Sequence, residues 1–402
     1  MSKTVTILGS TGTIGQNTLK CLALHPEKFS VRALVARENI ELLASQAKEF
    51  RPELVVVANQ SFYAELKNLL SGTNIKIAAG EEAVIEAASG GADITMSAIV
   101  GAAGLKPTLA AIKGGKTIAL ANKESLVCAG ELVQREVKKY GATIIPVDSE
   151  HNAIFQIIHN LTSNSPLNNA NSPLPNPPPN GEGISGIERV TITASGGPFR
   201  TFTLEQMKNV TPQQAIRHPN WNMGAKISVD SATMMNKGLE LIEAFYLFPL
   251  RAQQLHILVH PQSIIHALVE MIDGSVLAQM SQPDMCTPII NALAYPERIS
   301  APVQKLRLEE IGNLSFEAPD ATRFPAIALA QTVLMTGGNT PTILNAANEV
   351  AVERFLRGEI AFLDIAKIVE KTLEILYSNP LETIDDVLEC DRFARHHAEK
   401  LK

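Results

Sequence analysis

The sequence predicts an α/β fold with three parts: a doubly wound parallel sheet, a smaller α+β domain and a C-terminal helical domain. Over residues 1–150, short apolar runs alternate with helix-like segments, which is typical of βαβ units with a sheet buried on both faces. The first run leads into a glycine loop that opens a helix, as in nucleotide-binding sheets. From about residue 312 the apolar residues keep helical spacing.

The apolar runs of the first 150 residues predict seven strands, at Val5–Leu8, Val31–Val35, Leu54–Ala58, Ile75–Ala78, Ile94–Ala98, Thr117–Ala121 and Thr143–Val147. Further along, we expect strands at Arg189–Ala194, His256–Val259 and Ser275–Gln279, and helices from Thr340, over Ala361–Tyr377 and over Thr383–Leu401. The predicted domains are a nucleotide-binding domain at 1–150, a catalytic domain at 151–290, a linker at 291–311 and a helical domain at 312–402.

Residues 163–187 interrupt this organisation with a segment rich in proline and asparagine. Such a composition buries too little apolar surface to offset the entropy lost on ordering. We therefore predict a surface insertion in the catalytic domain, with a proline-rich docking segment as the alternative.

Bulk composition indicates a cytoplasmic enzyme. The net charge of −6 disfavours a nucleic-acid partner, which would need a basic surface. No apolar stretch of about 18 residues is present, so no membrane span is expected. The four cysteines form no C-x-x-C pair, which fits a reducing compartment and argues against a thiolate zinc site.

The glycine loop, Gly9-Ser-Thr-Gly12-Thr-Ile-Gly15, lies between the first strand and the first helix. Glycines let the backbone approach a pyrophosphate, and the helix N-terminus supplies N–H donors. The spacing is G-x-x-G-x-x-G, so a plain tight turn is the alternative. At the end of the second strand, Arg37 favours the 2′-phosphate of NADPH, unless Glu38 and Asn39 serve only to begin the next helix.

Two carboxylates, Asp148 and Glu150, follow the last predicted strand of the sheet. If the backbone stays extended there, both point to one face, about 7 Å apart along the chain. Neighbouring carboxylates repel unless a cation or proton lies between them, and oxygen ligands suit Mg²⁺ or Mn²⁺. The alternative is a solvated turn that caps a helix.

Residues 218–243 combine many polar side chains with glycines, which suggests a site for a phosphorylated small molecule. Asn236, Glu240 and Glu243 fall on one face of a predicted helix; a solvated helix side is the alternative. His218–Trp221 has the composition of a mobile lid. Ser195 with the glycines after it resembles a phosphate-contacting turn, although a plain turn would have the same composition.

Seven motifs together resemble the 1-deoxy-D-xylulose 5-phosphate reductoisomerase family, in order along nearly the whole chain. They are GSTGTIG (9–15), ALANKESLV (119–127), PVDSEHNAIFQ (146–156), ASGGPFR (194–200), RHPNWNMGAKISVDSATMMNKGLE (217–240), HPQSIIHALV (260–269) and LNAANEVAV (344–352). The resemblance implies a homodimer that uses NADPH and a divalent metal, Mg²⁺ or Mn²⁺ with Co²⁺ as a further candidate. It implies conversion of 1-deoxy-D-xylulose 5-phosphate to 2-C-methyl-D-erythritol 4-phosphate in non-mevalonate isoprene biosynthesis.

The resemblance also assigns site residues by position. NADPH would contact Thr11, Gly12, Thr13, Ile14, Arg37, Asn39, Asn122 and Gly224. The metal would bind Asp148, Glu150 and Glu240. The sugar phosphate would bind Lys123, Glu124, Ser149, Ser195, His218, Ser231, Asn236 and Lys237, of which Lys123, His218 and Lys237 are also expected to be catalytic, together with Glu150. The chain departs from the family pattern at Ala36 and Glu38, beside the cofactor loop.

In the implied reaction, a divalent ion would hold the ketone oxygen and the adjacent hydroxyl of the sugar. Retro-aldol cleavage with re-addition and an α-ketol shift both remain open. One rival is a metal-free NADP-dependent semialdehyde dehydrogenase, which would need a catalytic cysteine, and Cys128 lies in a helix-like run. Another is a non-catalytic NADP-sensing protein, which would leave the carboxylates unexplained.

Overall fold

The computed structural model describes residues 2–163, 186–221, 223–375 and 379–401. Most of the predicted insertion, residues 164–185, thus lies outside the described residues. The chain divides into two compact units built from non-consecutive segments. The first unit comprises Met1–Ser125, Val133–Phe155 and Asp284–Gln304. The second unit comprises Leu126–Leu132, Gln156–Pro283 and Lys305–Lys402.

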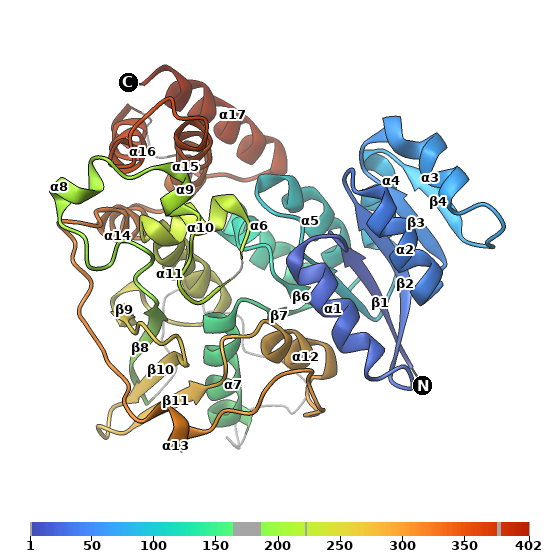
Figure 1. Cartoon of the computed structure of the whole chain (residues 1–402), viewed down its shortest axis with the longest axis horizontal. Coiled ribbons are helices and arrows are strands. Elements are labelled where there is room, and N and C mark those ends of the chain that lie inside the picture. Colours follow the sequence, from blue (N-terminus) through green and yellow to red (C-terminus); the bar gives the residue numbers. More distant parts are fainter. Residues whose placement is uncertain (1, 164–185, 222, 376–378, 402) are drawn as a thin grey trace. The chain divides into compact units, whose positions relative to one another are not determined.

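A seven-stranded parallel sheet forms the centre of the first unit, in the order β4-β3-β2-β1-β5-β6-β7 (Figure 1). Its strands are β1 (Lys3–Leu8), β2 (Phe29–Ala36), β3 (Leu54–Val57), β4 (Lys76–Ala79), β5 (Ile94–Ser97), β6 (Thr117–Leu120) and β7 (Thr143–Pro146). The predicted doubly wound sheet is confirmed. The strand order turns back at β1, and the loops after β1 and β5 therefore diverge at the position where such sheets bind nucleotides.

Helices cover this sheet, so its apolar strands are buried. They are α1 (Thr13–Ala23), α2 (Ile40–Phe50), α3 (Tyr63–Leu69), α4 (Glu81–Ser89), α5 (Leu105–Lys113) and α12 (Cys286–Ala294). Helix α1 packs with α12, and α4 packs with α5. Helices α6 (Glu124–Tyr140) and α7 (Ser149–Ser163) each contribute residues to both units.

The second unit contains a four-stranded mixed sheet in the order β11-β10-β8-β9. Its strands are β8 (Ile187–Ala194), β9 (Leu255–Val259), β10 (Ile265–Met271) and β11 (Val276–Met280). Strand β8 runs parallel to β9 and antiparallel to β10. The sequence predicted three of these strands and missed β10, although β10 pairs with both β8 and β11.

Nine further helices belong to the described residues of the second unit. They are α8 (Leu204–Met207), α9 (Pro212–Ala215), α10 (Ala225–Ala232), α11 (Met235–Leu247), α13 (Leu308–Ile311), α14 (Ala326–Thr336), α15 (Thr340–Leu356), α16 (Asp364–Ile375) and α17 (Ile384–Lys400). Helices α16 and α17 pack on α15, and α14 packs on α11. The last contact is close, because a Cβ added at Gly238 would lie 2.8 Å from the Cβ of Ala330.

The compact units cut across the predicted domain boundaries, which remain predictions. Residues 284–304 belong to the first unit, and the predicted linker at 291–311 includes the end of α12 as well as α13. Within the described part of the chain, no helix has the length and apolar character needed to cross a membrane.

Candidate active site

The glycine loop between β1 and α1 has a backbone that only glycine allows at two positions. Gly9 has φ +89°, and a Cβ there would lie 2.7 Å from the carbonyl oxygen of Ala98. A Cβ at Gly15 would lie 2.3 Å from the carbonyl oxygen of Gly9. Gly12 begins α1 without a side-chain cap. The loop thus presents the N–H groups of the first turn, from Thr13 on, as donors for an anion.

The residues after β2 fit both predictions made for them, a helix cap at Asn39 and a phosphate contact at Arg37. The side-chain oxygen of Asn39 accepts a hydrogen bond from the Leu42 N–H at 3.2 Å, so Asn39 caps α2. Arg37 has an 86% exposed side chain whose Nε lies 3.4 Å from Oε1 of Glu38. The guanidinium is therefore accessible for a phosphate, and its role in NADPH binding stays a prediction.

Asn122 holds the loop after β5 through its side chain. Its amide nitrogen donates to the carbonyl oxygens of Ile99 at 2.6 Å and Gly101 at 3.0 Å, and to Glu124 at 3.1 Å. Both Asn122 and Glu124 are buried. The side-chain donors of Asn122 are thus used within the protein, and any contact it makes with a cofactor would come from the backbone.

An ion pair between a buried lysine and a half-buried aspartate joins the carboxyl ends of two neighbouring strands of the sheet. Lys123 follows β6, Asp148 follows β7, and the Lys123 Nζ lies 2.6 Å from Oδ2 of Asp148. The Asp148 side chain is 15% exposed. Because ligands bind at this edge of a parallel sheet, the pair lies at the position expected for chemistry.

The extended geometry expected for residues 148–150 is wrong, because α7 begins at Ser149. The Asn152 N–H donates to the carbonyl oxygen of Asp148 at 2.8 Å, which is the hydrogen bond of a first helical turn. Glu150 therefore lies in the first turn of α7, where the helix dipole favours a negative charge. The Ser149 hydroxyl donates to Oε2 of Glu150 at 2.6 Å.

The Ser195 turn follows β8 and continues with two left-handed glycines, Gly196 (φ +83°) and Gly197 (φ +67°). A Cβ at Gly197 would lie 2.6 Å from the carbonyl oxygen of Ser231, so the turn packs directly on the end of α10. The Gly197 N–H donates to the Ser195 hydroxyl at 3.2 Å. The turn therefore brings Ser195 close to the backbone of Ser231.

His218 contacts the same hydroxyl and is held as one neutral tautomer. Its Nδ1 accepts the N–H groups of Asn220 at 3.2 Å and Trp221 at 3.0 Å, so the proton resides on Nε2. Nε2 lies 2.9 Å from Oγ of Ser195 and donates to it. Burial, and then the charge of Lys237, lower the pKa of His218 to about 4. Ser195 Oγ accepts two hydrogen bonds, which leaves its own O–H to donate to a ligand.

The predicted lid, His218–Trp221, is tied to the segment before β10. The Asn220 side chain donates to the carbonyl oxygen of Pro261 at 2.7 Å and to the hydroxyl of Ser263 at 3.0 Å. The ring centroids of Trp221 and His266 lie 6.5 Å apart. Ser263 was not among the predicted site residues; the only signal was its place in the HPQSIIHALV motif. Motion of the lid stays a prediction.

Buried charges occupy the start of α11. Lys237 Nζ lies 2.6 Å from Oε2 of Glu240, and the Asn236 side chain donates to Oε1 of the same carboxylate. Glu240 is 1% exposed and Glu243 is fully buried. The solvated-side alternative for this helix is therefore wrong. Asn236, Lys237 and Glu240 come together as predicted from their spacing.

Two predicted residues lie at the ends of α10. Gly224 precedes the helix with φ −63°, and a Cβ there would meet no atom within 4 Å, so the structure explains no need for glycine. Ser231 lies in its last turn, partly exposed, next to the buried Asp230. The second unit contains seven of the predicted site residues: Ser195, His218, Gly224, Ser231, Asn236, Lys237 and Glu240. The remaining predicted site residues belong to the first unit.

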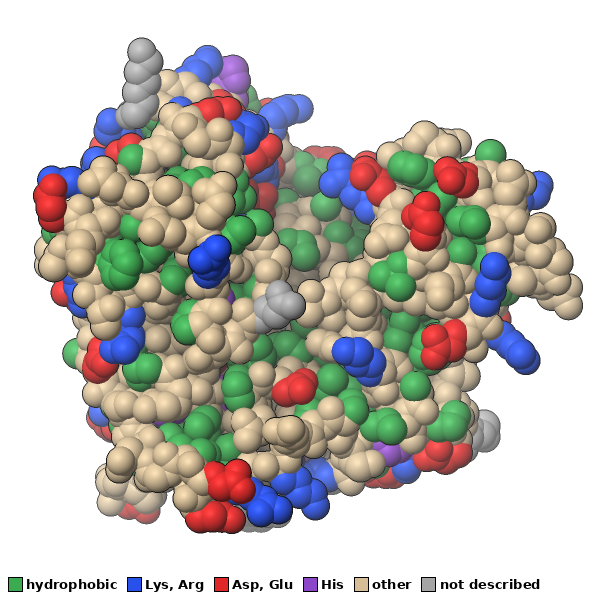
Figure 2. Space-filling model, in the orientation of Figure 1, with side chains coloured by type: hydrophobic (Ala, Val, Ile, Leu, Met, Phe, Trp, Pro, Cys, Tyr) green, Lys and Arg blue, Asp and Glu red, His purple; other side chains and the backbone are tan. Residues whose placement is uncertain are grey.

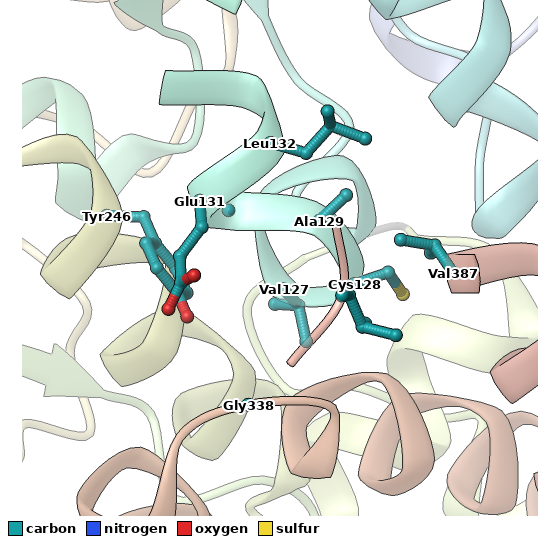
Figure 3. Close-up of a pocket in the computed structure, with 10 residues that line it drawn as sticks. Val127, Cys128, Ala129, Glu131, Leu132, Tyr246, Gly338 and Val387 are labelled. Atoms are coloured by element: carbon teal, nitrogen blue, oxygen red, sulfur yellow. The ribbon is translucent and has the colours of Figure 1, made fainter. Parts of the chain in front are cut away.

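A separate pocket of the second unit contains none of the predicted site residues (Figure 3). Its lining includes Cys128, Glu131, Tyr246, Gly338 and Val387. Burial, and then Glu131, raise the pKa of Tyr246 to about 12. The described lining residues include one carboxylate, Glu131, and neither a histidine nor a basic side chain. Cys128 itself is buried.

Comparison with protein families identifies the chain. A model described as 1-deoxy-D-xylulose 5-phosphate reductoisomerase matches residues 5–130, and models of C-terminal domains of that enzyme match residues 144–248 and 280–397. The chain belongs to the 1-deoxy-D-xylulose 5-phosphate reductoisomerase family. A relative of that name from Rhodospirillum centenum is 52% identical over 99% of this chain and 94% of the relative. One from Zymomonas mobilis is 50% identical over 99% and 97%.

Solved structures of the family have the same fold. The Zymomonas mobilis reductoisomerase in complex with NADPH is 48% identical, covers 99% of this chain and 98% of its own, and gives a TM-score of 0.89. A reductoisomerase in complex with NADPH, fosmidomycin and magnesium is 42% identical, covers 98% and 97%, and gives a TM-score of 0.87. The resemblance that the motifs indicated is thereby confirmed.

Proposed function

We propose that this protein converts 1-deoxy-D-xylulose 5-phosphate to 2-C-methyl-D-erythritol 4-phosphate with NADPH and a divalent metal, in isoprene biosynthesis. Family membership supports the reaction. The observation that carries the proposal is the buried ion pair of Lys237 and Glu240 at the start of α11, together with the half-buried Asn236 that donates to Glu240. Burying charges is costly, and packing alone does not require them there.

The glycine loop fits NADPH. A cofactor pyrophosphate can approach Gly12 and the first turn of α1 because Gly9 and Gly15 carry no Cβ. Thr11, Thr13 and Ile14 would surround it, and the exposed Arg37 would contact the 2′-phosphate, with Asn39 beside it. When bound, NADPH would supply the hydride that reduces the rearranged sugar.

Three carboxylates suit a divalent ion: Asp148, Glu150 and Glu240. Their oxygens are the hard ligands that Mg²⁺ and Mn²⁺ prefer, with Co²⁺ a further candidate. The buried Glu240 has a fixed orientation through Lys237 and Asn236. Solved structures of the family contain magnesium, which supports a divalent ion as the cofactor. When bound, the ion would polarise the sugar oxygens as a Lewis acid.

The phosphate end of the sugar would bind in the second unit, at Ser195, Ser231, Asn236 and Lys237. The Ser195 O–H is free to donate because Oγ already accepts from His218 and Gly197. Binding energy from this remote group would orient the reacting carbons. At the reacting end, Lys123 would stabilise developing negative charge, Glu150 would move protons, and Glu124 and Ser149 would hold the sugar.

A homodimer is the proposed assembly, and β11 is its proposed contact. Among the described strands β11 pairs with β10 alone, so its other edge is open. Val276 and Leu277 on this strand are 53% and 39% exposed, and the neighbouring Ile272 is 72% exposed. An open edge with apolar side chains is a template for pairing with a second chain. Sedimentation velocity of the wild type and Leu277→Lys tests this; a monomeric wild type contradicts it.

Other partners receive no support from the surface. On the face drawn in Figure 2, acidic and basic side chains are interspersed over the described residues, without the basic stripe that nucleic-acid binding uses. Among the described residues, the four cysteines form no disulfide, which fits the proposed cytoplasmic location.

The deciding experiment follows NADPH absorbance at 340 nm with the purified protein, the sugar phosphate and Mg²⁺. We expect oxidation only when all components are present, and loss of the rate on adding a chelator. A rate that survives chelation would favour a metal-free dehydrogenase. NADPH binding without any turnover would favour an NADP-sensing protein.

A further inference from the structure

The motif LNAANEVAV in α15 contains two buried asparagines with different partners, and the proposed reaction uses neither. Asn345 and Asn348 are both fully buried. The Asn345 side chain donates to Glu349 of its own helix at 3.2 Å. The Asn348 side chain donates instead to Oδ1 of Asp230, in α10, at 2.7 Å. Asn348 therefore connects the C-terminal helices to the segment that carries Ser231.

Asp230 is a buried carboxylate whose two oxygens are both engaged. It is 1% exposed, and its Oδ2 lies 2.9 Å from Lys226 Nζ, one turn earlier on α10. Removing a partner from a buried charge leaves the charge poorly compensated. A carboxylate only accepts hydrogen bonds. The Asn348 side chain must therefore point its amide nitrogen, and not its oxygen, toward Asp230 in α10. Asn348 thus joins α15 to the last turn of α10, against which α15 packs.

The last turn of α10 positions the proposed phosphate site. Ser231 follows Asp230 directly, and its carbonyl oxygen lies against the Ser195 turn, where a Cβ at Gly197 would be 2.6 Å away. Helix α11, with Asn236 and Lys237, begins three residues after α10 ends. A shift of α10 would therefore displace Ser231 relative to both neighbouring parts of the site.

We propose that Asn348, acting through Asp230, is a positioning residue for the phosphate group of the substrate. The proposal rests on the proposed function, in which Ser231 contacts that phosphate. In this role the C-terminal helices do more than pack, since α15 fixes the geometry of a binding site to which it contributes no ligand. The effect should appear in the KM for the sugar phosphate and leave the affinity for NADPH unchanged.

The test compares Asn348→Ala with Asn345→Ala, a matched control at an equally buried asparagine one turn earlier in the same helix. We expect Asn348→Ala to raise the KM for 1-deoxy-D-xylulose 5-phosphate about tenfold, the value of one hydrogen bond to a buried charge. The NADPH dissociation constant should stay within about twofold. Asn345→Ala should lower the melting temperature similarly and leave the KM within about twofold. Equal KM values for the two variants would overturn the proposal.

A double-mutant cycle separates positioning from general weakening of the fold. If Asn348 acts through Ser231, the double variant Ser231→Ala/Asn348→Ala should have a KM less than twofold above that of Ser231→Ala alone. The reason is that the effects of mutations at coupled residues do not add. Fully additive effects would contradict the positioning role. A Ser231→Ala variant with an unchanged KM would instead contradict the phosphate assignment, so the two failures are distinguishable.

If Asn348→Ala does not fold, Lys226→Met carries the same test from a part-exposed position. It removes the other partner of Asp230 and should raise the KM in the same direction by about threefold. An unchanged KM in this variant would count against the proposal.

Discussion

The two proposed ligand sites bind by different means, although both are for phosphate groups. The glycine loop of the first unit offers backbone N–H groups at the start of α1 and depends on the absence of side chains at Gly9 and Gly15. The phosphate site of the second unit depends on side chains: a serine oriented by His218, and a lysine paired with Glu240. The first site thus requires room for the cofactor beside the backbone, and the second requires charged side chains held inside the protein.

This difference determines which changes each site tolerates. A backbone site is lost when a Cβ fills it, whereas its polar side chains can vary. A site of buried charges is lost when one partner is removed, because the remaining charge stays in a low-dielectric surrounding. Mutations in the two sites should therefore act by different mechanisms and lower activity by different amounts.

The largest effect is expected from Lys237→Met. It removes the proposed phosphate contact and leaves Glu240, which is 1% exposed, without its cation. We expect kcat/KM to fall at least about 1000-fold and the free energy of unfolding to drop by about 3–5 kcal/mol. Steady-state kinetics and urea unfolding measure the two effects.

A double variant, Lys237→Met with Glu240→Gln, is the control for Lys237→Met. It removes both charges, so most of the stability should return while activity stays lost. Recovery of activity together with stability would show that the pair serves the fold alone.

A smaller loss is expected from Gly15→Ala. The added Cβ would lie 2.3 Å from the carbonyl oxygen of Gly9 and 2.5 Å from the Cα of Ser10, so the loop must move. Overpacking of about 1–3 kcal/mol corresponds to an NADPH dissociation constant raised about 5- to 150-fold. Fluorescence titration with NADPH measures it. Gly90→Ala, at a helix end with φ −65°, is the control; equal losses in both variants would contradict the loop assignment.

These two sites also differ in how far the sequence predicts them. Gly9, Gly12 and Gly15 lie within seven residues, so local spacing and the flanking strand and helix are enough. The strands were predicted for the same reason, since a sheet buried on both faces leaves continuous apolar runs. Local patterns failed at residues 148–150, where an extended backbone was expected and α7 begins instead.

Contacts between distant segments could not be predicted from local patterns. The bond from Asn348 to Asp230 spans 118 residues, and the contact of Asn220 with Ser263 spans 43. The burial of α11 depends on α14 packing against Gly238, so spacing alone left the solvated-side alternative open. The neutral tautomer of His218 depends, by contrast, on local N–H groups, those of Asn220 and Trp221 in its own loop.

The smallest effect is expected from pH at His218. Its folded pKa is about 4, below the ordinary 6.5, so the imidazole is neutral between pH 6 and 8. The KM for the sugar phosphate should show no His218 ionisation in that range. The unfolded chain takes up this proton near pH 6.5, so the folded state should lose stability as pH falls from 6.5 toward 4.

KM–pH profiles of the wild type and His218→Gln test the assignment of a neutral histidine. The two profiles should have the same shape from pH 6 to 8, although the variant binds more weakly. An ionisation near 6.5 that is present in the wild type and absent from the variant would show that His218 titrates during turnover.

Glu240→Gln tests the central claim most directly, because this carboxylate is assigned to both the buried charge group and the metal. Mutating a residue that only orients a metal ligand typically lowers metal affinity or activity by about 10- to 100-fold. Because Glu240 is assigned as a ligand itself, we expect its loss to lower turnover at least about 100-fold. The measurement is NADPH oxidation at increasing Mn²⁺, with NADPH affinity determined separately. We predict reduced turnover, a weaker apparent affinity for Mn²⁺ and an NADPH dissociation constant within about twofold of the wild type. Near-normal turnover with an unchanged Mn²⁺ dependence would contradict the account.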